Sequence, residues 1–304
     1  MKLNIILLFV LLLCSLLFAE GSAAVFLSMP VGWRNIALGG SGVALGGDIN
    51  AGWFNPAALM KVKGVSITSG YSPMALNRSL THLAAGWNIK NDAAVSLNWV
   101  HADAGQIPGR DISGNYTHDL KYGEDAIFLT FAKSVTSDIA LGTNVKYLQA
   151  RLDEITAYVA GFDFGIYGEV FDDRLSLGFV YQNIGVKYQW NSGNQYGTEN
   201  ASAADETILS TIKFGAGYTP KNIPLVMVAD IDYYKLDEVK LHAGVQWSPI
   251  DGAKVAAGID DLLPTLGAGY EYDAKFGVFG LGYSFKFERE GLPPRHSFDI
   301  TARF

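Results

Sequence analysis

The sequence predicts an all-β fold, a transmembrane antiparallel β-barrel of about 14 strands with an N-terminal plug in its lumen. Three observations lead to this prediction. Long stretches alternate apolar and polar residues with a period of two, and charged residues make up only 17% of the chain. A short apolar leader precedes the alternating stretches. The 34 glycines and 12% aromatic residues also favour a sheet protein with a large apolar surface over a helical globule.

The leader comprises residues 1–19. It has a basic start, then an almost wholly apolar run, and Ala19 precedes the polar Glu20. This order is typical of a secretory signal peptide, and the run is shorter than the roughly 20 residues that a spanning helix needs. The only cysteine, Cys14, lies within the leader. We therefore expect export, cleavage near Ala19 and a mature chain without cysteine.

Residues 64–304 form the predicted barrel. Val239 and Leu241 share one face of a strand while Lys240 and His242 point to the other, which is the pattern of a sheet with unlike faces. The length of each segment suits a membrane-spanning strand of about 9–11 residues. The predicted strands are 64–71, 79–90, 92–102, 124–134, 139–150, 157–170, 174–184, 208–219, 224–234, 238–248, 253–260, 266–273, 276–287 and 295–304.

The connections between these strands differ in length. The odd-to-even connections 103–123, 185–207 and 288–294 are long, although 235–237 is short. The even-to-odd connections 90–92, 135–138, 171–173 and 249–252 are tight. Outer-membrane barrels have short periplasmic turns and longer outer loops, and aromatic residues such as Trp99, Tyr147 and Tyr233 lie near strand ends as a girdle would. We therefore expect the outer membrane of a didermic bacterium.

The last strand ends in an aromatic residue. Phe298, Ile300 and Phe304 share one face of it. A terminal aromatic strand of this kind looks like the signal that the outer-membrane assembly machinery reads, so these three residues are the candidate barrel assembly signal.

Residues 20–63 do not alternate and are rich in glycine. They contain large apolar residues, among them Phe26, Trp33 and Trp53, that must be buried somewhere, and the lumen is the enclosed volume available. Asn55 before Pro56 is typical of a capped helix start. The run at 38–42 lacks the Lys and Ser/Thr of a phosphate-binding loop, so packing of a plug is the better interpretation.

Gly32 and Arg34 are followed by Gly39-Gly40, Asp48 and Asn55-Pro56-Ala57. This order resembles the N-terminus of the PorV/PorQ family, within the FadL-like group of long-chain fatty-acid transporters of the outer membrane. The resemblance extends over the mature chain and implies a barrel whose first residues form a plug, or hatch, inside the lumen. A kink in the third strand opens the wall in some of these transporters, but 92–100 contains neither Gly nor Pro, so we do not count on such a gate here. The plug motif carrying the resemblance is Gly32, Arg34, Gly39, Gly40, Asp48, Asn55, Pro56 and Ala57.

Charges of both signs fall at inward positions of the predicted strands. Two interpretations stay open: they form ion pairs that grip the plug, or they simply solvate the lumen. The candidate lumen charges are Lys146, Asp163, Glu169, Asp230, Asp232, Lys240, Lys254 and Glu271.

Signals for catalysis and for nucleic-acid binding are weak. The five histidines show no metal-ligand spacing, and no serine, histidine and acid fall together, so we expect no enzyme activity, no metal and no cofactor. A formal net charge of −7 gives no basic footprint for nucleic acid.

The expected partners are outer-membrane lipid, the assembly machinery, and either a hydrophobic ligand or a secretion-system protein. The FadL-like resemblance implies transport of hydrophobic small molecules. The PorV/PorQ resemblance implies an accessory barrel that binds proteins in type IX secretion. A structural barrel without transport is the third possibility.

Overall fold

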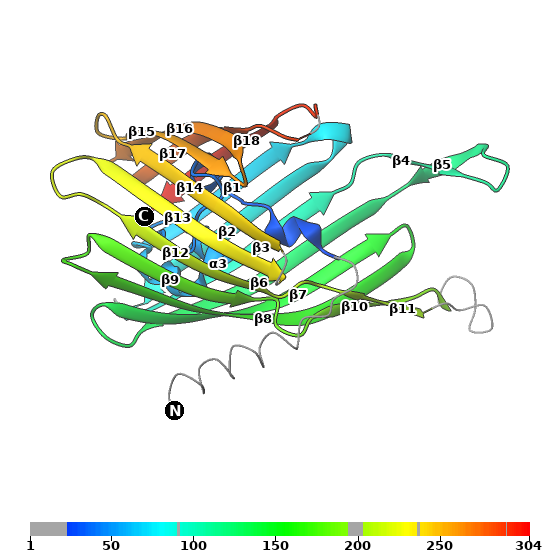
Figure 1. Cartoon of the computed structure of the whole chain (residues 1–304), viewed down its shortest axis with the longest axis horizontal. Helices are drawn as coiled ribbons and strands as arrows, with labels where there is room; N and C mark the ends of the chain where they lie inside the picture. The colour runs from blue at the N-terminus through cyan, green and yellow to red at the C-terminus, as the bar shows by residue number, and fades with distance from the viewer. Residues whose placement is uncertain (1–22, 90–91, 194–202, 236–237, 290) are drawn as a thin grey trace.

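The computed structural model describes residues 23–89, 92–193, 203–235, 238–289 and 291–304. The predicted signal peptide at 1–19 and the turn positions 90–91 and 236–237 lie outside them. Fourteen antiparallel strands close into one barrel, so the prediction of an all-β antiparallel barrel of about 14 strands is confirmed (Figure 1).

The barrel strands run in chain order around the wall, interrupted twice by hairpins that stand outside it. The barrel strands are β1 (Val65–Pro73), β2 (Ser79–Ile89), β3 (Ala93–Asp103), β6 (Tyr122–Ser134), β7 (Ile139–Leu152), β8 (Ile155–Val170), β9 (Leu175–Gln182), β12 (Thr211–Tyr218), β13 (Leu225–Lys235), β14 (Glu238–Trp247), β15 (Ala253–Asp260), β16 (Leu263–Ala274), β17 (Gly277–Lys286) and β18 (Arg295–Arg303). The hairpins are β4 (Ile107–Arg110) with β5 (Tyr116–Leu120), and β10 (Lys187–Asn191) with β11 (Ala203–Thr207).

The last strand closes the barrel against the first. β1 pairs with β18 from Ser66↔Arg303 to Tyr71↔Phe298, and the backbones of Val65 and Phe304 exchange two further hydrogen bonds. Every wall strand thus has a neighbour on each side. The neighbours accept and donate the backbone hydrogen bonds that hydrocarbon cannot provide. β3 pairs with β2 and β6 without a register shift, so the wall has no kink there.

The outer face of the wall is apolar. Leu97, Leu129, Phe162 and Leu281 point outward and are exposed, while the intervening residues face the lumen. An apolar belt of this kind is stable in a hydrocarbon environment and costly in water. Among the described helices, none is both long and apolar enough to span a membrane.

The two hairpins were not predicted. They fall within the connections 103–123 and 185–207, because their four or five paired residues alternate too briefly to be recognised as strands. Both extend from the same end of the barrel, which we call the hairpin end; the opposite end is the turn end (Figure 1). The predicted sorting of loops by length is weaker than expected, since 153–154 and 261–262 at the hairpin end are tight turns. Asp261 and Leu262 both have positive φ, as such two-residue turns require.

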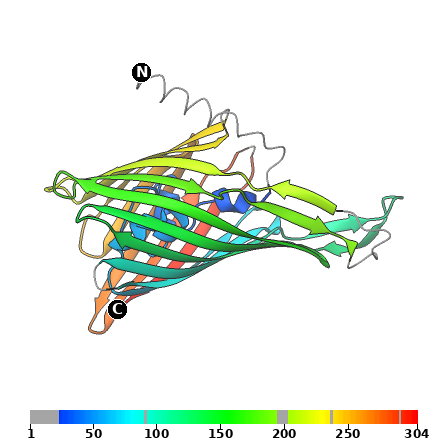
Figure 2. The same cartoon turned by 90° about the horizontal axis from the view of Figure 1, so that it is seen from below.

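The N-terminal segment, residues 23–64, runs inside the barrel (Figure 2). It contains η1 (Val25–Ser28), α2 (Trp33–Ala37), α3 (Ala51–Phe54) and η2 (Pro56–Lys61). A further turn, η3 (Ala75–Asn77), connects β1 with β2. The segment starts at the hairpin end, where Ala23 donates its N–H to Thr207 O at 3.2 Å, and it reaches β1 at the turn end.

Candidate functional site

The lumen brings the N-terminal segment against the inner wall at glycines. A β-carbon at Gly142 or Gly165 would clash with Pro56 or its neighbours, and one at Gly269 or Gly282 would clash with the Trp33 indole. Gly244 and Gly258 face Leu38 and Gly39 in the same way. These inward glycines, which we call the wall glycines, allow the backbone to approach the wall directly. They comprise Gly142, Gly165, Gly178, Gly215, Gly244, Gly258, Gly267, Gly269 and Gly282.

Asn55 joins three parts of the molecule. Its side chain is fully buried, and its amide nitrogen donates to Val43 O at 2.7 Å and to Ile166 O of β8 at 3.0 Å. Its Oδ1 accepts the N–H of Ala57 at 3.0 Å, which caps η2 with Pro56 at the first helical position. The Asn-Pro-Ala part of the plug motif therefore fixes a turn directly on the wall.

The glycine pair of the motif lies against β14–β16. Gly39 and Gly40 have φ of +73° and +83°, which only glycine adopts readily. Gly39 donates its N–H to Thr265 Oγ1 at 3.1 Å, and its carbonyl lies 2.8 Å from His242 Nδ1. Thr265 donates in turn to Ala37 O at 2.9 Å.

Asp230 of β13 binds the next part of the segment. One carboxylate oxygen, Oδ2, accepts the N–H of Gly42 at 2.6 Å and that of Val43 at 2.9 Å. Asp230 is 3% exposed, so these two bonds offset the cost of burying its charge. Asp230 is thus one predicted lumen charge that contacts the N-terminal segment directly.

Three other motif residues shape the turn end of the segment. Arg34 donates from Nε to Gln246 Oε1 at 2.7 Å. Gly32 has a φ of +81°, and a β-carbon there would clash with Asn50. Asp48 accepts the N–H of Asn50 at 2.9 Å. Arg34 and Asp48 line a small chamber of about 70 Å³ whose wall carries Lys254, Glu271 and Arg303.

The other predicted lumen charges form pairs. Glu169 pairs with Lys61 of the segment, whereas Lys254 of β15 pairs with Glu271 of the neighbouring strand β16. Lys146 lies 2.7 Å from Asp163, and Asp232 lies 2.7 Å from Lys213. Lys240 lies 4.5 Å from the centre of the Tyr234 ring. Asp230 and Glu169 thus contact the N-terminal segment, while the other pairs lie within the wall. Whether these charges grip a plug or solvate the lumen stays a prediction.

Several lumen residues escaped the sequence prediction. His242 lies 3.0 Å from Asp260 and 3.5 Å from Asp232, and Asp260 also pairs with Lys286 at 2.5 Å. The register between neighbouring strands would have identified this group, because it places His242 opposite both Asp230 and Asp260. The two-residue alternation along a strand shows which face of the wall a residue lies on, but it does not show which residue of the neighbouring strand lies opposite.

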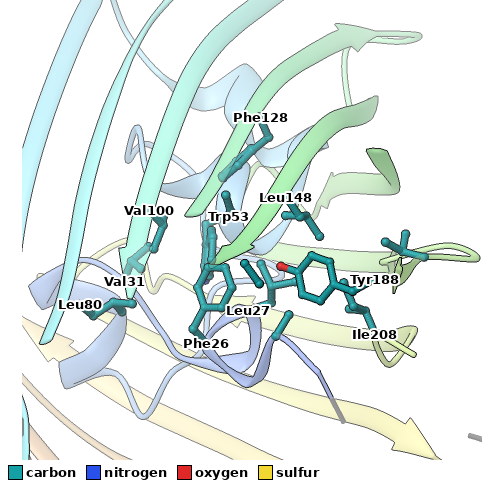
Figure 3. Packing of buried hydrophobic residues seen from close by; sticks show 14 of the residues in the cluster. Phe26, Leu27, Val31, Trp53, Leu80, Val100, Phe128, Leu148, Tyr188 and Ile208 are labelled. Carbon is teal, nitrogen blue, oxygen red and sulfur yellow. The ribbon is translucent and has the colours of Figure 1, made fainter. Parts of the chain in front are cut away.

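The hairpin end of the lumen holds an apolar cluster, which we call the mouth cluster. Figure 3 shows Phe26 and Leu27 of η1 and Trp53 of α3 packed against inward residues of the wall such as Phe128 and Leu148. Tyr188 of β10 completes it, together with Val186 just before β10 and Ile208 just after β11. Tyr188 thus connects the base of the hairpin with the apolar interior of the barrel. The buried members are Ala24, Phe26, Leu27, Val31, Trp53, Phe54, Leu80, Val100, Ala126, Phe128, Leu148, Ala150, Ala157, Val186, Tyr188 and Ile208.

A cavity of about 250 Å³ lies beside the mouth cluster. Leu27, Ile208 and Leu209 form its apolar side. Lys213 and Tyr234 lie on the other side. Its size and mixed lining suit a small organic molecule rather than a protein segment.

Catalytic and metal-binding arrangements do not emerge from the described residues. Within them no group of three or more His, Cys, Asp or Glu side chains is placed to hold a metal. His82 lies 3.2 Å from Asp299, but Ser297 donates to that same carboxylate rather than to the imidazole. This arrangement does not activate the serine as a nucleophile.

The predicted assembly-signal residues lie on the outer face of the closing strand. Phe298, Ile300 and Phe304 are all exposed toward the surroundings of the barrel. Phe304 also packs edge-to-face on Phe279 of β17, with ring centres 6.1 Å apart. Their role in assembly stays a prediction.

Comparison with solved structures shows a shared fold. A FadL homologue of Pseudomonas aeruginosa aligns with a TM-score of 0.60 and 13% identity, over 90% of this chain and 99% of that one. The toluene transporter TodX of Pseudomonas putida aligns with a TM-score of 0.63 and 14% identity, over 94% and 98%. The monoaromatic hydrocarbon channel CymD gives 0.60 and 11%, over 93% and 97%. No family model and no curated protein sequence matches the chain.

Proposed function

We propose that this protein is a FadL-like outer-membrane channel for hydrophobic small molecules. The observation that carries the proposal is the mouth cluster, the apolar cluster at the hairpin end of the lumen, which borders a cavity of about 250 Å³. An apolar region at one end of a closed barrel favours molecules that leave water readily. The names of two similar structures, a toluene transporter and a monoaromatic hydrocarbon channel, support the same class of substrate.

The proposal assigns the predicted plug, residues 20–63, as a hatch. The hairpin end faces outward, and molecules pass the mouth cluster and the cavity beside η1 before they reach the segment. The contacts of Asn55, Gly39 and Asp230 support a segment that obstructs the lumen. A cleaved leader at 1–19 and assembly through the Phe304 strand belong to the same proposal, and recovery of the mature protein in the outer-membrane fraction tests both.

The experiment compares one introduced side chain on the two faces of the wall. Ala126 faces the mouth cluster and is fully buried, whereas Leu97 faces outward and is 58% exposed. Host cells that convert toluene in the cytoplasm report uptake through product formation. We expect uptake above the empty host for the wild type and for Leu97→Trp, and background uptake for Ala126→Trp, because only the latter fills the lumen. Heat-modifiable migration on gels checks that both variants fold.

Uptake by the wild type equal to that of the empty host would contradict the proposal. In that case the PorV/PorQ-like role in type IX secretion gains weight. Purification of the barrel from its own membrane with a secretion-system protein attached would support that role. A barrel that carries neither ligand nor protein would support a structural role.

A further inference from the structure

Two buried polar groups lie within the apolar surroundings of the mouth cluster. Glu124 of β6 is 7% exposed, and Tyr188 of β10 is completely buried. Among the described residues, neither Glu124 Oε1 nor the Tyr188 hydroxyl has a hydrogen-bond partner. Figure 3 shows the Tyr188 hydroxyl pointing inward, into the cluster.

The two groups come from different elements, the wall strand β6 and the hairpin strand β10. Glu124 faces the lumen and pairs in register with Ala150, which belongs to the same cluster as Tyr188. Burial and then the carboxylate of Glu124 raise the pKa of the Tyr188 hydroxyl. The Tyr122 hydroxyl forms a hydrogen bond with the Glu124 carboxylate, which leaves Oε1 without a partner, and Glu206 is a further ionisable group beside it.

Unpartnered polar atoms in an apolar region are rare because burial without a hydrogen bond is costly. They persist where a bound molecule or a functional step supplies the partner. A carboxylate oxygen requires a donor, while a phenol hydroxyl both donates and accepts. One group that satisfies both at once is a hydroxyl, which donates to Glu124 and accepts from Tyr188.

We propose that Glu124 and Tyr188 bind the hydroxyl of an apolar alcohol or phenol whose hydrocarbon part lies in the mouth cluster. The inference rests on the proposed function and narrows its substrate class. A pure hydrocarbon leaves both polar atoms without partners, so the site discriminates against it.

The test compares toluene with 4-methylphenol, which differs by one hydroxyl. Saturable binding of each is measured with the full barrel in lipid nanodiscs, after subtraction of binding to empty nanodiscs. We expect 4-methylphenol to bind at least about tenfold more tightly than toluene. Tyr188→Phe should remove most of that preference and leave toluene affinity within about twofold of the wild type. Glu124→Gln should reduce the preference as well.

Two controls separate binding from structure. Tyr116→Phe removes a hydroxyl from an exposed tyrosine of the outer β4–β5 hairpin and should leave the preference intact. The thermal midpoint of Tyr188→Phe should not fall, because its hydroxyl has no partner to lose. Equal binding of the two probes, or an unchanged preference in Tyr188→Phe, would overturn this inference while leaving the transport proposal standing. Absence of binding for both probes would overturn the two together.

Discussion

Two parts of the N-terminal segment, residues 23–31 and 32–62, are attached to the barrel by different kinds of contact. Residues 32–62 make directional contacts: Asn55 with Ile166, Gly39 with Thr265, and Gly42 with Asp230. Residues 23–31 place Phe26 and Leu27 in the mouth cluster, and their hydrogen bonds to the rest of the protein involve their backbone atoms: Ala23 N–H with Thr207, Met29 O with Trp53 and Pro30 O with Arg295. Hydrogen bonds in a closely packed wall specify one geometry, whereas apolar contacts allow repacking at lower cost.

This difference divides the segment into a fixed part and an adaptable part. The fixed part lies on wall glycines and has little room to move, because any shift brings backbone against backbone. The adaptable part borders both the cavity and the β10–β11 hairpin. Access to the lumen is therefore expected to change at residues 23–31 first.

The largest expected effect comes from removing both parts. Deletion of residues 24–58 takes away α2, α3 and η1 together, and we expect a folded barrel with raised conductance in planar bilayers because the obstruction is gone. The same deletion should abolish selective uptake. Unchanged conductance would mean that the segment does not obstruct the lumen and that the hatch assignment is wrong.

The second largest effect is expected from a reversible disulfide that fixes the adaptable part, residues 23–31, to residue 208. Ala23 and Ile208 form a parallel bridge, and neighbouring strands about 4.8 Å apart suit a disulfide. In the double variant Ala23→Cys/Ile208→Cys, oxidation should lower toluene uptake toward background, and a reductant should restore it. The single cysteine variants serve as controls. Equal uptake in both redox states would contradict movement of residues 23–31.

Removal of one anchor of the fixed part should have a smaller effect. Asp230→Ala leaves the N–H groups of Gly42 and Val43 without their acceptor, so we expect a loss of about 2–4 kcal/mol in the free energy of unfolding and a modest rise in conductance. Asp251→Ala, in an exposed turn, is the matched control and should change neither. Similar stability of the two variants would show that Asp230 does not anchor the segment.

The smallest expected effects come from two single substitutions, one that removes hydrogen bonds to the fixed part and one that changes an apolar contact of the adaptable part. Thr265→Val keeps the shape of the side chain but removes its bonds to Gly39 and Ala37, and should cost about 1–3 kcal/mol. Leu27→Met in the mouth cluster conserves volume and should cost less than about 1 kcal/mol. Denaturant unfolding of the two variants measures the difference. A larger loss for Leu27→Met would reverse the proposed division.

The wall could be predicted from sequence because each strand carries its own signal. Alternation located β14 at 238–248 and β15 at 253–260, against Glu238–Trp247 and Ala253–Asp260 in the structure. The two faces of a spanning strand contact lipid and lumen, so the chemistry of the wall repeats at every second residue. The β10–β11 hairpin has too few paired residues to give that signal.

The lumen was only partly predictable, because its contacts join residues far apart in the chain. The motif residues Asn55 and Gly39 were identified, but nothing in one sequence pairs them with Ile166 or Thr265. Gly282 looks like any small residue of a strand until Trp33 is placed on it. Tyr188 lay in a predicted loop, so its burial in the mouth cluster could not be foreseen.

The wall glycines have a consequence for how the barrel is assembled. A slip of one residue in strand register turns every side chain to the opposite face. At Gly282 it would bring Leu281 or Tyr283 into the space that Trp33 occupies, and at Gly215 it would bring in Phe214 or Ala216 against Val43. A misregistered barrel therefore cannot accommodate the N-terminal segment. We therefore expect the packing of the segment in the lumen to favour the correct strand register over a register shifted by one residue.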